Sequence, residues 1–257
     1  MEDKTNKIVR FDLTVEKEDS NKKNRIIDTN DLMKLCLFVD AFKRFVGRMP
    51  CRLVLPYIPY ARQDRVANEG EALSISVFCN ILNSLNFKQV IVLDPHSDVS
   101  TALLNNVKII PQWEIFADSV PADVDLISPD AGALKKIYKL QQAVKKLGID
   151  VPVRTATKHR DTQTGFISNT TLDGNPTHKT CVVVDDICDG GGTFNALANV
   201  LNEQYEKRIL MVTHGIFSKG LEELSKNYDR LLSTNSWNGE LKPEGKLRVI
   251  SVEKLLK

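Results

Sequence analysis

Short apolar runs rich in β-branched residues alternate with longer stretches of helical periodicity along most of the 257-residue chain. The short runs predict buried strands, and the amphipathic stretches between them predict helices. The predicted strands are 52–57, 89–94, 125–128, 180–185 and 208–213, and the predicted helices are 72–85, 133–146, 194–203 and 221–226. Alternation of this kind with short connections predicts an α/β fold of mainly parallel sheets flanked by helices.

The alternation is interrupted between Pro111 and Pro121. We therefore expect two domains with a similar alternation of strands and helices, residues 1–113 and residues 114–257. Within the second, the segment 158–176 is polar and rich in Thr, Asp, Asn and Gly, which predicts either a mobile loop or a hairpin.

Polar clusters follow the predicted strands at 60–65, 94–98, 128–132, 185–193 and 213–214. In α/β sheets, ligands bind at the carboxyl ends of the strands. The shared placement of these clusters makes all of them candidates for a binding site.

The most informative cluster follows the run Val182–Val184. It contains the residues Asp185, Asp186, Asp189, Gly190, Gly191, Gly192 and Thr193. A glycine loop that leads into a helix points backbone N–H groups at an anion, which suits a phosphate, and two adjacent carboxylates can bind the vicinal hydroxyls of a ribose. No lysine follows the glycines as in a Walker loop, and the G-x-G-x-x-G pattern is absent. The alternative is a glycine-rich surface turn with solvated aspartates.

A second cluster contains Arg62, Gln63, Asp64 and Arg65. Guanidinium groups bind phosphate oxygens in a bidentate manner, so this cluster is a candidate clamp for a nucleotide triphosphate. Read by itself, it is equally consistent with ion pairing at the surface.

His96 and Asp130 can each supply a ligand to a hard divalent ion, since magnesium takes few protein ligands and completes its shell with phosphate oxygens and water. A purely structural histidine is the alternative for His96. Lys158 and Arg160, in the polar segment, can stabilise charge on a reacting phosphate, with ordinary loop charge as the alternative.

Composition narrows the class further. Charged residues make up 26% of the chain with a net charge of +2, and the two signs are interspersed, so nothing marks a nucleic-acid-binding face. No apolar run is long enough to cross a membrane, and the polar start is unlike a signal peptide. Five scattered cysteines without a C-x-x-C pair indicate reduced thiols. We therefore expect a cytoplasmic protein without membrane or nucleic-acid partners.

Together the segments resemble one family, the ribose-phosphate diphosphokinases, or phosphoribosyl diphosphate (PRPP) synthetases, and this chain is identified as a shortened and divergent member. The matching segments are 30–41, 56–65, 94–96, 128–132, 158–160, 184–193 and 213–218. They occur in the order found in the family. The glycine loop also occurs in phosphoribosyltransferases, whereas Tyr60–Arg65 and Ser128–Asp130 separate the two families.

The resemblance implies two phosphoribosyltransferase-like domains and a transferase that moves the β,γ-diphosphate of ATP to the anomeric hydroxyl of a ribose 5-phosphate, releasing AMP. By this resemblance, ATP is bound by Arg62, Gln63, Asp64, Arg65 and His96, and Mg²⁺ is bound by His96 and Asp130. The catalytic residues are Lys158, Arg160 and His96. The ribose hydroxyls are bound by Asp185 and Asp186, and the 5-phosphate by Asp189–Thr193. It also implies a homo-oligomer, either a dimer or a hexamer.

One departure from the family bears on the substrate. The loop reads Asp189-Gly190-Gly-Gly-Thr193, where the family usually has Asp-Thr-Gly-Gly-Thr. Loss of the threonine side chain removes a phosphate donor and is expected to free space beside the 5-phosphate. The acceptor is then either ribose 5-phosphate, giving PRPP, or ADP-ribose, giving ADP-ribose 1-diphosphate for NAD rebuilding. The alternatives are a non-catalytic, synthetase-associated binding subunit and, third, a phosphoribosyltransferase.

A second departure concerns the N-terminus. The adenine-contacting element of the family has only a weak match in this chain, at Phe11–Glu16. The mode of adenine binding is therefore not carried over from the family.

Overall fold

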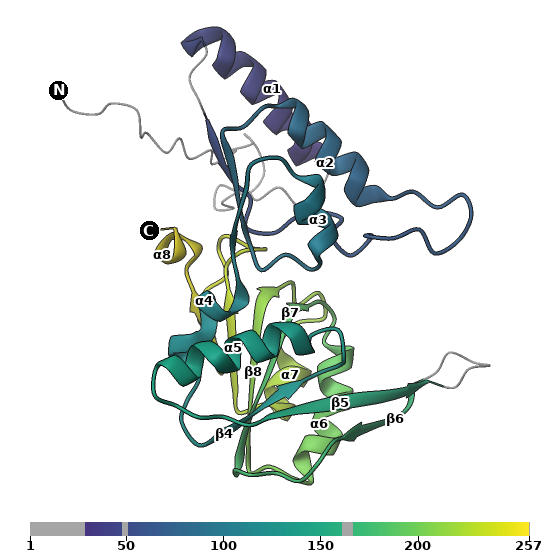
Figure 1. The fold of residues 1–257 in the computed structure, drawn as a ribbon, viewed down its shortest axis with the longest axis vertical. Coiled ribbons are helices and arrows are strands. Elements are labelled where there is room, and N and C mark those ends of the chain that lie inside the picture. Colours follow the sequence, from purple (N-terminus) through teal and green to yellow (C-terminus); the bar gives the residue numbers. More distant parts are fainter. Residues whose placement is uncertain (1–28, 48–50, 161–166, 257) are drawn as a thin grey trace, which may run out of the picture. The chain divides into compact units, whose positions relative to one another are not determined.

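The computed structural model describes residues 29–47, 51–160 and 167–256, so the segment Phe11–Glu16 lies outside the described residues. The chain divides into two compact units (Figure 1). Unit 1 contains residues 1–110 together with the short segment Ser236–Glu240, and unit 2 contains the rest. Each unit has its own sheet.

Unit 1 has a three-stranded parallel sheet in the order β1-β2-β3. Its elements are α1 (Thr29–Val46), β1 (Arg52–Val54), α2 (Ser74–Ser84), β2 (Gln89–Leu93), α3 (Asp98–Leu103) and β3 (Val107–Ile110). The core contains Leu35 of α1, Phe78 of α2 and Val92 of β2, all of them buried. Apolar positions of the helices therefore cover this sheet.

Unit 2 has a seven-stranded sheet in the order β10-β9-β8-β7-β4-β5-β6. Its elements are α4 (Gln112–Phe116), β4 (Val124–Ser128), α5 (Leu134–Lys146), β5 (Val153–Arg160), β6 (Ile167–Leu172), β7 (Thr180–Cys188), α6 (Gly192–Asn202), β8 (Lys207–Gly215), α7 (Glu222–Asn227), β9 (Arg230–Thr234), β10 (Leu247–Ile250) and α8 (Val252–Leu255). Every neighbouring pair of strands is parallel except β5 and β6. The prediction of an α/β fold with mainly parallel sheets is confirmed.

The central strands of unit 2 are longer than the sequence pattern predicts. The prediction ended a strand at Asp185 and began a helix at 194, but β7 continues to Cys188 and α6 begins at Gly192. The strand continues because β8 pairs with it throughout, up to Cys188 opposite Gly215. Asp185 and Asp186 therefore lie inside β7 and not after it, and Thr213 and His214 likewise lie inside β8.

The described parts of the polar segment 158–176 belong to the strand pair β5–β6 and the turn that follows it, which agrees with the hairpin, one of the two predicted alternatives. β5 and β6 pair antiparallel, with Lys158 opposite Thr170, and the register shifts between His159 and Arg160. The two strands extend away from the rest of unit 2 as a ribbon (Figure 1). Lys158 and Arg160 thus have the backbone of a strand, not of a loop.

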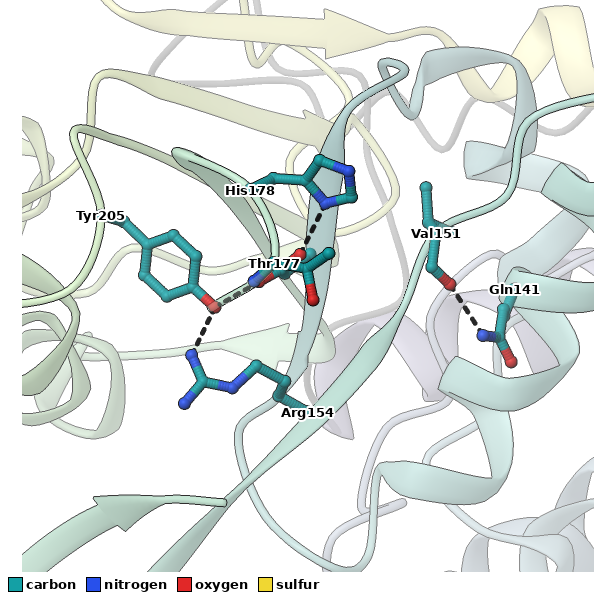
Figure 2. A network of polar contacts seen from close by, with 7 residues as sticks. Gln141, Val151, Arg154, Thr177, His178 and Tyr205 are labelled. Carbon is teal, nitrogen blue, oxygen red and sulfur yellow. Dashed lines mark hydrogen bonds and ion pairs between the residues drawn. The ribbon is translucent and has the colours of Figure 1, made fainter. Parts of the chain in front are cut away.

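A buried polar network joins the base of this hairpin to the sheet (Figure 2). The Arg154 guanidinium donates to the backbone oxygens of Asp173 and Gly174 at 2.8 and 2.7 Å, and to the Tyr205 hydroxyl at 2.6 Å. That hydroxyl donates to the buried carboxylate of Asp125 at 2.8 Å. Asp125 also accepts from the Thr177 backbone N–H at 2.9 Å, and its second oxygen lies 2.7 Å from His178 Nδ1.

This network joins Tyr205, two residues before β8, to Asp125 of β4, Arg154 of β5 and the turn after β6. Its members satisfy one another's hydrogen bonds, as groups buried from water must. The hairpin is consequently held at its base by charged groups, in addition to the β5–β4 ladder.

Candidate functional site

The glycine loop of unit 2 leads directly from β7 into α6. Gly191 precedes the helix with φ of 75°, and a Cβ at this position would approach Leu224 Cδ2 to 3.2 Å. Both the left-handed backbone and the close packing therefore require glycine here. Among the described residues no side chain caps α6, so the N–H groups of its first turn point at the loop without a side-chain acceptor. Such an end favours an anion.

Carboxylates gather next to this loop. Asp186 is buried, and Lys136 of α5 lies 3.2 Å from its Oδ2. Burial, reinforced by the adjacent charge of Asp186 and more weakly by Asp130, raises the pKa of Asp185 well above its ordinary value. The Asp186 backbone N–H, which donates to Asp185 Oδ1 at 2.9 Å, acts in the opposite direction. Unit 2 thus brings Asp130, Asp185 and Asp186 together around one lysine.

Lys136 was not predicted from the sequence. It lies six residues after Asp130 in a helix with several lysines, and no local pattern distinguishes it from the others. Its role becomes visible only because α5 packs along β4 and brings its ammonium to the end of β7.

The segment after β8 forms one wall of the glycine loop. The backbone N–H groups of Ile216 and Phe217 both donate to the Cys188 carbonyl, at 2.9 and 3.1 Å. The Ser218 hydroxyl donates to Asp189 Oδ1 at 2.6 Å. Next to it, the side chain of Lys219 packs against Gly190, with its Cδ 3.3 Å from the position that a Cβ of residue 190 would take. The space expected beside Gly190 is therefore lined by a lysine stem on this side.

The arginine-containing segment of unit 1 follows β1. Tyr60 has φ of 62°, the Gln63 N–H donates to its carbonyl at 2.9 Å, and its hydroxyl lies 2.9 Å from Thr29 Oγ1. Arg62, Gln63 and Arg65 are exposed, and Asp64 is partly buried. These turns fix the backbone of the segment while leaving its guanidinium groups accessible to a ligand.

His96 follows the neighbouring strand β2 and is exposed. The Leu93 N–H donates to the Pro56 carbonyl at 3.1 Å, so the segments that follow β1 and β2 start side by side. Asp94, which directly follows β2, is buried and has φ of 34°, and its backbone N–H donates to the Ile110 carbonyl at 2.8 Å. Unit 1 therefore places the predicted ATP-binding residues on two adjacent connections at the carboxyl end of its sheet.

The donor atoms suit magnesium better than a transition metal. Within the described part of the chain, no three His, Cys, Asp or Glu side chains group as a complete metal site. Magnesium does not need such a group, since phosphate oxygens and water supply most of its ligands. Asp130 and Asp185 offer the hard oxygen donors that it prefers, and Asp130 is oriented by the Ala133 N–H at 3.1 Å.

The parallel sheet of unit 2, with a glycine loop between β7 and α6 and carboxylates beside it, defines a class: the phosphoribosyltransferase-type α/β domain. Residues 123–246 match the family model of the phosphoribosyl transferase domain. Residues 20–85 match the N-terminal domain of ribose phosphate pyrophosphokinase. The crystal structure of phosphoribosylpyrophosphate synthetase from Mycobacterium smegmatis is similar to this chain, with a TM-score of 0.74 and 25% identity over 88% of this chain and 74% of that one.

Curated relatives of the chain indicate the same family. The ribose-phosphate pyrophosphokinase of Aquifex aeolicus is 30% identical over 237 residues, which cover 88% of this chain and 74% of the relative. That of Mycoplasma genitalium is 29% identical over 84% of this chain and 65% of its own length, and the match to the Mycoplasma pneumoniae protein spans 58% of that relative. The chain belongs to the ribose-phosphate pyrophosphokinase family. It spans less than two thirds of the length of both Mycoplasma relatives.

Proposed function

We propose that the protein is a magnesium-dependent diphosphotransferase that moves the β,γ-diphosphate of ATP to the anomeric hydroxyl of a phosphorylated ribose. The observation that carries the proposal is the juxtaposition, in a chain of this family, of the uncapped N-terminus of α6 with the carboxylates of β7. A phosphate bound at the loop would bring the hydroxyls of its ribose toward Asp185 and Asp186, which lie near the end of β7 that leads into the loop.

In this reaction the anomeric oxygen attacks the β-phosphorus of ATP. The bond from that phosphorus to the α,β-bridging oxygen breaks, AMP leaves with the bridging oxygen, and the hydroxyl proton is released. Magnesium, when bound, would neutralise phosphate charge. The protein's own contribution is to position the two substrates and stabilise charge, which accounts for most catalysis of phosphoryl-type transfer.

The residue roles in this proposal are those that the resemblance to the family implies. Asp189–Thr193 bind the acceptor phosphate and Asp185 and Asp186 its ribose. In unit 1, we propose Arg62, Gln63, Asp64, Arg65 and His96 as ATP-binding residues. His96, and in unit 2 Asp130, are each proposed as a ligand of magnesium. Lys158 and Arg160, which β5 carries near the end of the hairpin, stabilise the charge that develops during transfer.

The proposal leaves two candidate acceptors. Ribose 5-phosphate is the acceptor that the names of the relatives support. ADP-ribose is favoured by one observation, the glycine at 190, whose φ lies outside the left-handed region, so that the backbone itself does not require a glycine there. A donor side chain at this position is therefore compatible with the backbone but absent, as expected for an acceptor whose 5-phosphate carries a further group.

The experiment is to incubate the protein with ATP and Mg²⁺, offer each acceptor separately, and identify the products by mass spectrometry. AMP together with PRPP, or AMP together with ADP-ribose 1-diphosphate, is the expected result. If neither acceptor leads to AMP release, the chain is a non-catalytic binding subunit. Consumption of PRPP with a nucleobase, without ATP, would identify a phosphoribosyltransferase instead.

The acceptor is tested by Gly190→Thr. The restored hydroxyl is expected to shift the ratio of kcat/KM toward ribose 5-phosphate by about tenfold, the value of one added hydrogen bond to a charged phosphate. Gly192→Ala, in the first turn of α6 with open space around its Cβ position, is a control for a nearby methyl group. If Gly190→Thr and the parent protein have the same preference, the acceptor is not selected at this position.

Localisation and assembly are part of the proposal. The five cysteines are free thiols, which supports the cytoplasm as the compartment. No helix in the described ranges is both long and apolar enough to cross a membrane. We expect a dimer or hexamer, to be measured by light scattering.

A further inference from the structure

The side chain of Lys219 packs against the position that the Cβ of a residue other than glycine would take at position 190. A Cβ built on Gly190 would be 3.3 Å from Lys219 Cδ, 3.4 Å from Cε and 3.5 Å from Cγ. Three carbons of the lysine stem thus pack along the exposed edge of the phosphate loop. A lysine and a glycine that are 29 positions apart in the sequence form one surface here.

The backbone that carries Lys219 is held in place. On one side, the segment is tied to the end of β7 by the hydrogen bonds of Ile216 and Phe217 to Cys188, and by that of Ser218 to Asp189. On the other side, the Gly220 N–H donates to the Phe217 carbonyl at 2.8 Å, which closes a tight turn. The Cα of Lys219 is therefore fixed beside the loop, although its side chain is exposed.

The charge of Lys219 is available to a ligand. Within the described ranges its ammonium forms no hydrogen bond or ion pair, whereas the ammonium of Lys136 is paired with Asp186. The loop itself has no cationic residue between Asp185 and Thr193. Lys219 is thus a cation at the edge of a loop that would otherwise present only backbone N–H groups, a hydroxyl and carboxylates.

We propose that Lys219 determines acceptor specificity by binding the second phosphate of a diphosphate-linked ribose, while the loop 189–193 binds the first. The inference rests on the proposed function and names its acceptor class. A hydroxyl on residue 190 would be attached directly to the Cβ and would reach a phosphate inside the loop. The Lys219 ammonium is one bond beyond Cε at the end of a long, exposed side chain, so it can reach a phosphate group outside the loop. A monoester has no phosphate group there, but a diphosphate such as that of ADP-ribose does.

The test is Lys219→Met, which keeps an unbranched stem against Gly190 and removes the charge. Binding of ADP-ribose and of ribose 5-phosphate is measured by calorimetry without ATP, at a fixed ionic strength. We expect the Kd for ADP-ribose to rise about tenfold, the effect of one charge-assisted hydrogen bond, and the Kd for ribose 5-phosphate to stay within about twofold. Lys207→Met is the matched control and should change neither value, since Lys207 is an exposed lysine at the start of β8, whereas Lys219 lies in the segment after the end of that strand.

Three results would overturn the inference: an equal loss for both acceptors, which would assign Lys219 to the phosphate they share; no loss for either; or a parent protein that binds neither. Because the measurement does not involve turnover, its outcome is separate from that of the activity assay. A protein that binds ADP-ribose through Lys219 but releases no AMP would contradict the proposed reaction and leave the specificity determinant standing.

Discussion

Asp185 and Asp186 are adjacent acidic residues inside a strand, and their side chains have different surroundings. Asp186 has a partner in Lys136 at 3.2 Å, whereas the charge of Asp185 is opposed by burial and by Asp186 itself. A carboxylate whose pKa is raised in the folded state costs stability wherever it is ionised. The pair is therefore better explained by ligand binding than by stability, since ribose hydroxyls can donate to these oxygens.

Asp185→Asn is predicted to stabilise the fold. At pH 7 the free energy of unfolding should rise by about 1 kcal/mol or more, because one pKa unit corresponds to about 1.4 kcal/mol and the substitution removes the buried charge. Since the folded pKa is raised, the gain should disappear as the pH falls below the ordinary value of 3.8, where the parent residue is protonated in both states. Urea unfolding at pH 7 and at about pH 3 measures this.

Asp150→Asn, at an exposed position with a surface ion pair to Lys145 at 3.7 Å, is the control and should change stability by less than about 0.5 kcal/mol. A loss of stability in Asp185→Asn at pH 7 would contradict the explanation. The same variant is expected to bind either acceptor more weakly.

The hairpin of β5 and β6 is the element that connects stability to the proposed chemistry. It carries Lys158 and Arg160 in β5, and its base is fastened by the Arg154, Tyr205 and Asp125 network (Figure 2). Tyr205 is buried, and this burial raises the pKa of its hydroxyl. The hydroxyl therefore stays protonated and donates to Asp125 while accepting from Arg154.

Tyr205→Phe is predicted to lower the free energy of unfolding by about 1–3 kcal/mol, because it leaves a buried guanidinium N–H and a carboxylate oxygen with one partner fewer. Chemical denaturation measures the loss. Tyr138→Phe, on the exposed face of α5, is the matched control and should be neutral. An effect of the same size in both variants would mean that the network does not fasten the hairpin.

At the scale of the whole molecule, all five cysteines are free, and two of them lie fully buried in β7. Burial raises the pKa of Cys181 and that of Cys188 to about 12, from an ordinary 9.0. Above pH 9 the unfolded chain therefore loses thiol protons that the folded chain keeps, so stability falls as the pH rises.

The expected slope is about 1.4 kcal/mol per pH unit for each of these two thiols between pH 9 and 12. Unfolding by urea, followed by circular dichroism at pH 8, 9 and 10, measures it. The variant with both Cys181→Ala and Cys188→Ala should have a shallower slope, although it is less stable at every pH. Equal slopes for the variant and the parent would show that other groups cause the alkaline loss.

Local patterns predicted the central strands and helices because each combines strong apolar periodicity with a clear polar boundary. Among these, β2 and α5 were predicted to within a residue or two at each end. The strands β3, β9 and β10 were not predicted, since they are short and are stabilised by their neighbours. The helix α1 was also missed, although Leu32, Leu35 and Val39 have the spacing of a helix face. The end of β7 was wrong because a pairing partner, β8, decides where a strand ends, and two aspartates do not.

The sequence alone determined the fold class, the family, the glycine loop and the acidic residues beside it, because these depend on residue types at short spacings along one segment. Tertiary structure decided what lies against that loop. Lys136 and Lys219 belong to other elements, 50 residues before Asp186 and 29 residues after Gly190. A contact at such separation leaves no local signal in one sequence, since it depends on how α5 and the end of β8 pack against β7. The sequence predicted that Gly190 frees space in the loop, whereas in the folded chain Gly190 lies against the side chain of Lys219.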